Sequence, residues 1–254
     1  MPAVDVYHER VGAGEPLLLL NGVMMTTQSW VFQTRALSSH FTCVLHDFRG
    51  QLRTPHPGRP IEMRDHVKDL AALLDRLGIE SAHLVGTSYG GEVAMLFALA
   101  HPHRVRSLSL IACVSHVEPP LRRAVELWRD TALHAPETLY DVTAPYNFSP
   151  TVLTPTFLEQ GRARLRSYPP EFFRGFAALC DAFLALDITH RLPEITARTL
   201  VICGENDVLK PRHYSEIIAA GVRGATLEVV AGAPHAAIIE SHEAVNPLLR
   251  AFLS

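Results

Sequence analysis

The chain has 254 residues, of which 48% are hydrophobic and 19% charged, so it can bury the core of one large globular domain and is unlike a disordered protein. Its net charge of -3, with acidic and basic residues interspersed, excludes the basic stripe that nucleic acid or an anionic membrane requires, and favours a small-molecule partner. The apolar runs are far shorter than the roughly 20 residues of a membrane-spanning helix, and no secretory signal is visible, so we expect a cytoplasmic protein.

The four cysteines include no CxxC pair. Cys43, Cys113 and Cys203 lie in apolar runs, where a free thiol packs as a small hydrophobic side chain. This pattern fits a reducing compartment and favours neither a disulfide nor a metal site. We therefore expect no metal and no cofactor, and the sequence leaves the oligomeric state open.

Short apolar segments alternate with helical patterns along most of the chain. Several of these segments are apolar at every position, as expected for strands of a sheet that helices cover on both faces. The segments predicted to be strands are residues 4–11, 16–20, 41–46, 82–86, 105–114, 199–204 and 226–232.

Helical patterns lie between these strands. Residues 63–77 carry apolar side chains at helical spacing and are followed by Gly78, a residue typical of the position just after a helix. The segment EVAMLFALAH after Ser88 has a helical composition and is stopped by Pro102. The alternation of strands and helices predicts an α/β fold with a doubly wound, mostly parallel sheet.

The alternation stops between residues 116 and 187, where no strand-like run occurs. This stretch is rich in aromatic residues and proline, and a connection of this length cannot be a bare loop in a compact domain. We expect a helical cap that lies over one end of the sheet. The predicted division is a core of residues 1–115 and 188–254 with a cap of residues 116–187, whose aromatic side chains mostly pack against the sheet while the others line a pocket.

The segment GTSYG, residues 86–90, has the pattern G-x-S-x-G between a predicted strand and a predicted helix. In that context the serine occupies a sharp strand-to-helix turn with an exposed hydroxyl, and a side chain at either glycine would collide across the turn. The N-terminus of the following helix favours a nearby oxyanion, because it presents free N–H groups and partial positive charge. Ser88 is therefore a candidate nucleophile rather than an ordinary turn residue.

A serine nucleophile needs a base within hydrogen-bond reach and an acid that orients the base. Asp207 follows one predicted strand and His235 follows the last, and functional groups gather at the carboxyl ends of parallel strands. The chain order of serine, aspartate and histidine is the order found in the fold that uses this turn. Ser88, Asp207 and His235 together predict a catalytic triad.

Other acids and histidines compete for these roles. Asp187 lies at the end of the predicted cap, and Glu205 comes very soon after its strand, so both are weaker candidates for the acid. His213 and His242 lie in predicted helices, where we expect them to be exposed. These alternatives stay open at the level of sequence.

The motifs resemble those of the α/β-hydrolase superfamily, and the resemblance covers the chain from about residue 4 to its end. GTSYGG, GENDVLKP and GAPH match the nucleophile, acid and histidine signatures of that family. LLLLNGVMMTTQSW, residues 17–30, matches its oxyanion-loop segment, and HDFRGQLRT, residues 46–54, matches its D-x-R-G stretch. The predicted cap also matches, since the family usually carries an insertion after its sixth strand.

The resemblance implies a role for each site residue. Ser88 would attack a carbonyl carbon, His235 would carry the proton, and Asp207 would hold the imidazole. The backbone N–H groups of Val23 and Tyr89 would bind the oxyanion, and the side chains of these two residues, with Met24, would face the acyl pocket. From the predicted cap, the candidate substrate-binding residues are Trp128, Tyr146 and Phe148.

Two departures from the family pattern affect the loops rather than the triad. Asn21 stands where the family usually has a histidine before glycine, so we expect its amide to hold the loop by hydrogen bonds. The stretch from Gly50 to Thr54 lacks the second glycine of the family's G-x-G-x-S, which predicts a differently shaped loop. Asp47 and Arg49 are expected to serve architecture rather than chemistry.

The serine in the turn excludes the branches of the family that use an aspartate nucleophile, the haloalkane dehalogenases and epoxide hydrolases. The default reaction is hydrolysis of a carboxylic ester, lactone or thioester of a small, largely apolar substrate, because the chain resembles enol-lactonases and small carboxylesterases. Alternatives are an acyltransferase that passes a hydroxyacyl group to a hydroxy acid, and a carbon–carbon bond hydrolase. A ligand-binding receptor with vestigial turnover is a more distant alternative.

Overall fold

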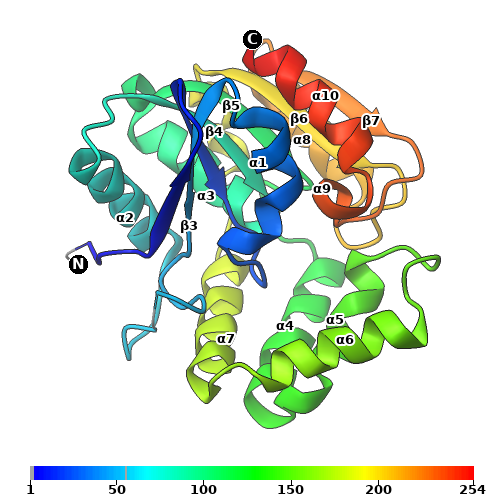
Figure 1. Ribbon diagram of the computed structural model, residues 1–254. Helices are drawn as coiled ribbons and strands as arrows, with labels where there is room; N and C mark the ends of the chain where they lie inside the picture. Colours follow the sequence, from blue (N-terminus) through cyan, green and yellow to red (C-terminus); the bar gives the residue numbers. More distant parts are fainter. Residues whose placement is uncertain (1–2, 55) are drawn as a thin grey trace.

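The computed structural model describes residues 3–54 and 56–254 and has one seven-stranded sheet between layers of helices (Figure 1). The strand order is β1-β3-β2-β4-β5-β6-β7, in which β1 is antiparallel to β3 and the other neighbouring pairs are parallel. The predicted doubly wound, mostly parallel sheet is confirmed. The strands are β1 (His8–Val11), β2 (Glu15–Leu20), β3 (Phe41–His46), β4 (Ala82–Thr87), β5 (Val105–Ile111), β6 (Arg198–Gly204) and β7 (Thr226–Val230).

Helices connect most of these strands and continue the chain after the last one. Those outside the region between β5 and β6 are α1 (Val31–Leu37), α2 (Met63–Arg76), α3 (Tyr89–Ala100), α8 (Arg212–Gly221), α9 (Ala237–Glu240) and α10 (His242–Leu253). Short 3-10 helices are Thr27–Trp30, Pro102–Arg104, Pro136–Thr138 and Thr189–Glu194.

The run of four leucines in β2 shows how the core is divided. Leu18 and Leu20 point to the face covered by α2, α3 and α8, while Leu17 and Leu19 point to the face covered by α1, α9 and α10. All four side chains are fully buried. A strand that is buried on both faces needs an apolar residue at every position, which explains the uninterrupted run.

Some predicted boundaries hold and others do not. Helix α2 is confirmed, and Gly78 follows it with a φ of +65°. The predicted strand over residues 4–11 is shorter in the structure, because Val4 N–H is bound by the carboxylate of Asp69 on α2 rather than by a strand. The predicted strand over residues 105–114 ends at Ile111, where Ala112 turns the chain with a φ of +53°.

Between β5 and β6 the chain forms helices only. They are α4 (Pro119–His134), α5 (Leu139–Asn147), α6 (Pro155–Arg166) and α7 (Pro170–Leu184), which Figure 1 shows grouped together below the sheet. An isolated bridge pairs His116 with Asp187, so the two ends of this helical segment lie side by side. The designation of residues 116–187 as a separate cap stays a prediction.

Two histidines, His46 and His66, lie inside the core, and neither forms an ion pair with an acid within the described part of the chain. His46 ends β3, and neither of its ring nitrogens has a hydrogen-bond partner among the described residues. Burial lowers the pKa of His46 to about 4 and that of His66 to about 3. His66 Nε2 lies 2.8 Å from the hydroxyl of Tyr89.

A depressed histidine pKa makes stability depend on pH. His46 takes up a proton near pH 6.5 in the unfolded chain, but only near pH 4 in the folded protein. The stability that depends on a neutral His46 is therefore fully present above pH 6.5 and is lost as the pH falls toward 4. Between pH 7 and pH 5, the unfolding free energy of the wild type should therefore fall by about 2 kcal/mol more than that of His46→Leu. Urea denaturation at both pH values measures this change. His40→Leu, at an exposed position, should leave the pH dependence as in the wild type.

Candidate functional site

Ser88 occupies the turn between β4 and α3, as predicted. Its φ of 50° and ψ of -123° lie in a region that residues other than glycine rarely adopt. Space across the turn is minimal: a Cβ on Gly90 would lie 2.0 Å from the carbonyl oxygen of Leu20, and one on Gly86 would lie 2.5 Å from that of Gly90. The backbone N–H of Ser88 donates to the carbonyl of Ile111 at 2.8 Å, which fixes the turn to β5.

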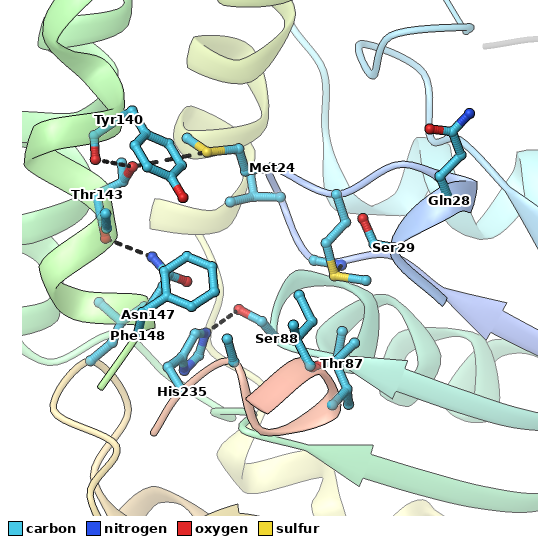
Figure 2. Close-up of a pocket in the computed structure, with 18 of the residues that line it drawn as sticks. Met24, Gln28, Ser29, Thr87, Ser88, Tyr140, Thr143, Asn147, Phe148 and His235 are labelled. Carbon is cyan, nitrogen blue, oxygen red and sulfur yellow. Dashed lines mark hydrogen bonds between the residues drawn. The ribbon is translucent and has the colours of Figure 1, made fainter. Parts of the chain in front are cut away.

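The predicted base and acid meet at this serine. His235 Nε2 lies 3.0 Å from Ser88 Oγ, and His235 Nδ1 lies 2.7 Å from Asp207 Oδ2 (Figure 2 shows the Ser88–His235 contact). The other carboxylate oxygen of Asp207 accepts from the N–H groups of Leu209 at 2.9 Å and Lys210 at 2.8 Å. Asp207 and His235 are buried, so a hydrogen-bonded series runs from a buried carboxylate through an imidazole to the serine hydroxyl.

The alternative acids and histidines lie elsewhere. Glu205 is exposed and accepts from the N–H of Gly232 at 2.8 Å, and Asp187 is also exposed. His213 is exposed as predicted and lies 3.1 Å from Glu118. The prediction for His242 is wrong, because its ring is half-buried against Phe32, with centroids 3.8 Å apart.

An ion pair that the sequence did not reveal joins α3 to the loop of Asp207. Lys210 Nζ lies 2.9 Å from Glu92 Oε1, and both side chains are buried. The same oxygen of Glu92 accepts from the N–H of Val114 at 2.9 Å. Burial raises the pKa of the Glu92 carboxyl, and the attraction of Lys210 opposes that rise. The ion pair therefore connects α3, the helix that follows Ser88, to Lys210, whose backbone N–H donates to Asp207.

The loop after β2 places a second set of polar groups beside Ser88. A Cβ built on Gly22 would lie 3.7 Å from the Cβ of Ser88. In the part of the chain that the structure describes, neither Val23 N–H nor Tyr89 N–H donates a hydrogen bond. Both residues border cavities at Ser88.

Two buried side-chain amides hold this loop in place. Asn21 Nδ2 donates to the carbonyl of His46 at 2.9 Å and to Gln51 Oε1 at 3.0 Å, and Asn21 Oδ1 accepts from Trp30 Nε1 at 2.8 Å. Gln51 Nε2 in turn donates to the carbonyls of Gly22 at 2.8 Å and Val23 at 3.3 Å. The expected role of Asn21 is thus observed, and Gln51 completes it.

The D-x-R-G stretch supports the same region. Asp47 is buried, and its carboxylate accepts from the N–H groups of Thr27 at 3.0 Å and Arg53 at 3.3 Å. Arg49 is fully buried and forms a two-pronged ion pair with Asp69 on α2. Neither side chain contacts Ser88 or His235 in the described structure, in agreement with an architectural role.

A cavity of about 240 Å³ opens onto Ser88 and His235. Of the predicted substrate-binding residues, Met24, Trp128 and Phe148 line it (Figure 2 labels Met24 and Phe148). Tyr146 does not line it, and its ring packs against Trp128 with centroids 5.6 Å apart. Lining residues that we did not assign from the sequence include Gln28, Phe32, Tyr140, Thr143, Asn147, Arg164 and Phe176.

The side chain of Tyr89 also differs from its prediction. Its ring is buried beside Phe48 and His66, so it does not face the large cavity.

No helix in the described residues is both long enough and apolar enough to cross a membrane. Over those same residues, no three side chains of His, Cys, Asp or Glu gather as a metal site would require.

Comparison with known proteins gives a consistent result. The profile of the family described as alpha/beta hydrolase fold matches residues 15–242. A Caulobacter segnis protein named "Putative carbamate hydrolase RutD" is 30% identical, over 98% of this chain and 95% of its own. A Comamonas testosteroni protein named 2-hydroxy-6-oxo-6-phenylhexa-2,4-dienoate hydrolase is 28% identical, over 98% and 91%. The crystal structure of MGS-M2, an α/β hydrolase from a Medee basin deep-sea metagenome library, has a TM-score of 0.92 at 25% identity, over 98% and 94%.

The hydrogen bonds of Gln51 predict a loss of reactivity at Ser88 when they are removed. Gln51→Leu removes the side chain that holds the loop of Val23, whose N–H is the predicted oxyanion donor. We therefore expect covalent labelling of Ser88 by a fluorophosphonate to slow by roughly 10- to 100-fold. Labelling rates followed by mass spectrometry measure the effect.

Ser107→Ala is the control for this experiment. Ser107 is also buried, but its hydroxyl lies 2.7 Å from His83 Nδ1, near the beginning of β4 and β5 and away from the loop. Its labelling rate should match that of the wild type. Equal rates for Gln51→Leu and the wild type would show that the loop keeps its shape without the amide.

Proposed function

Because the chain is a hydrolase that belongs to the α/β-hydrolase fold family, we propose that it is a serine hydrolase that works through an acyl-enzyme. The observation that carries the proposal is the series of contacts from Asp207 through His235 to Ser88, at 2.7 and 3.0 Å, ending in the wall of a cavity. A hydroxyl becomes a useful nucleophile only when a positioned base accepts its proton.

The proposed reaction begins with attack of Ser88 Oγ on the substrate carbonyl carbon while His235 Nε2 accepts the hydroxyl proton. Asp207 Oδ2 holds the Nδ1–H of the ring and stabilises the imidazolium that forms. The N–H groups of Val23 and Tyr89 donate to the oxyanion of the tetrahedral intermediate. The intermediate collapses when the bond to the leaving group breaks and His235 returns the proton to that group. Water then repeats the sequence and releases the acid.

The substrate that we propose is a small carboxylic ester, lactone or thioester. The cavity wall combines apolar side chains such as Met24, Phe32 and Phe148 with polar ones that include Gln28, Thr143, Asn147 and the cationic Arg164. This mixture is typical of a site that buries an apolar body and orients it by a small number of hydrogen bonds.

A carbamate is a second candidate substrate. The Caulobacter segnis relative carries that name, and it matches this chain over nearly the whole length of both proteins. A carbamate also presents a carbonyl carbon to a serine, so the same groups would serve. The acyltransferase and carbon–carbon hydrolase alternatives use these groups as well, and product analysis separates them by the acceptor or by the bond that breaks.

We also propose that residues 116–187 act as a cap over the bound substrate. Trp128, Thr143, Phe148 and Phe176 from this segment line the same cavity as Ser88. The segment is joined to the core next to the base: Ala236 N–H donates to the carbonyl of Asn147 at 2.8 Å. Ser149 N–H donates to a carboxylate oxygen of Glu240 at 2.8 Å, and Ser149 Oγ donates to the other at 2.5 Å.

Substitution of the three central residues tests the proposed function. Ser88→Ala and His235→Ala should each lower the turnover of 4-nitrophenyl acetate by roughly 10⁶, as in other serine triads. Asp207→Asn should lower it by roughly 10⁴, because the amide selects the wrong imidazole tautomer. Steady-state kinetics measures the losses, and circular dichroism should show an unchanged fold.

Two variants control for the substitutions themselves. Ser109→Ala removes a buried serine of β5 that has no hydrogen-bond partner within the described residues, and His213→Ala removes an exposed histidine. Both should keep wild-type turnover. Turnover of Ser88→Ala within tenfold of the wild type would rule out Ser88 as the nucleophile.

A further inference from the structure

A second, much smaller cavity also borders Ser88. It has a volume of about 20 Å³ and shares Val23, Ser88, Trp128 and Leu209 with the large cavity. His235 borders only the large cavity, whereas Tyr89 borders only the small one. Ser88 therefore lies between two chambers of unequal size, and the base faces only one of them.

The wall of the small chamber is apolar and comes mainly from two helices. Leu121, Val125 and Trp128 lie on one face of α4, and Cys180 and Phe183 lie one turn apart on α7. These five side chains are all at least nine-tenths buried.

Lys210 also borders the small chamber, but its ammonium group is paired with Glu92 at 2.9 Å. The chamber therefore presents no unpaired charge to a guest within the described structure. A single water needs roughly 10–15 Å³, so a chamber of about 20 Å³ holds a group of about the size of a methyl.

The position of the base decides which part of the substrate enters which chamber. In the proposed reaction His235 Nε2 must give its proton to the leaving group, so the leaving group must lie within hydrogen-bond reach of His235. Since His235 borders only the large chamber, the leaving alcohol belongs there. The other substituent of the carbonyl carbon is then directed toward the small chamber.

We propose that the preferred substrates are short-acyl esters, acetyl or propionyl, of bulky alcohols; this inference rests on the serine hydrolase function proposed above. Ser88 Oγ forms a bond to the acetyl carbonyl carbon, the carbon–oxygen bond to the alcohol breaks, and the alcohol leaves with the proton from His235. Water then attacks the acetyl-serine, gives its proton to His235, and releases acetic acid while Ser88 recovers its proton.

Two isomeric esters test the assignment directly. Benzyl acetate carries its bulk on the alcohol, whereas methyl phenylacetate has the same atoms with the bulk on the acyl group, and the two leaving alcohols have similar basicity. We expect kcat/KM for benzyl acetate to exceed that for methyl phenylacetate by at least about tenfold, because a pocket discriminates by roughly that factor for each methylene group. In a series of 4-nitrophenyl esters, kcat/KM should likewise fall by at least about tenfold from acetate to hexanoate.

Variants that enlarge one chamber at a time show which chamber limits the length of the acyl chain. Leu121→Ala and Val125→Ala should raise kcat/KM for the hexanoate relative to the acetate by about tenfold, since both side chains border only the small chamber. Phe148→Ala, which enlarges only the large chamber, should leave that ratio unchanged. The use of two variants, together with the isomer pair on the wild-type enzyme, keeps the test independent of whether one variant folds.

The outcomes separate the two proposals. Equal or better turnover of methyl phenylacetate by the wild-type enzyme would overturn the chamber assignment while leaving the serine hydrolase function intact. An acyl-length ratio that shifts with Phe148→Ala but not with Leu121→Ala or Val125→Ala would also overturn it. If no ester is hydrolysed and Ser88 resists fluorophosphonate labelling, the proposed function fails, and the assignment that rests on it falls as well.

Discussion

The close contact of α3 with the backbone of β2 and β4 is the constraint on which the site depends. At Gly86 and Gly90 there is no room for even one carbon atom, since each would lie within 2.5 Å of a backbone oxygen. The helix can therefore begin immediately after the strand, and the residue between them must take an unusual conformation. That residue is Ser88, and its backbone geometry directs the hydroxyl away from the core. The strained turn persists because the surrounding sheet over-determines it.

A second constraint acts on the loop opposite the serine. The family usually has a histidine at the position of Asn21, and this chain fills the position with an amide network instead. Each polar side-chain atom of Asn21 and Gln51 has a hydrogen-bond partner, and both side chains are buried. A fully satisfied buried network is rigid, whereas an unsatisfied one would cost free energy. The pair thus fixes the two carbonyls next to Val23 N–H.

The sequence predicted the sheet and the three central residues because both follow from local patterns. Continuous apolar runs mark buried strands, and Ser88, Asp207 and His235 each follow such a run, so their meeting at one edge follows from parallel topology. The prediction for Tyr146 was wrong for a physical reason: the rotation of α5 about its axis depends on how it packs against α4. The same applies to the ring of Tyr89, which turns toward His66 rather than toward the cavity.

Long-range pairs were beyond the reach of the sequence. Glu92 and Lys210 are 118 residues apart, and only the folded chain shows that their charges neutralise each other beside the serine. Gln51 occupies a variable position of the G-x-G-x-S stretch, whose missing glycine falls at position 52, and nothing local indicated that its amide reaches the loop after β2. Composition and periodicity report burial, but they do not report which buried polar groups are partners.

The bonds from Asn147 and Ser149 to Ala236 and Glu240 have a mechanical consequence. These bonds join the end of α5 to the residues directly after His235, so the helical segment cannot swing outward there without breaking them or pulling the imidazole with it. As long as these bonds stay intact, any displacement of the helical segment on this side is transmitted to the residues that position the His235 ring.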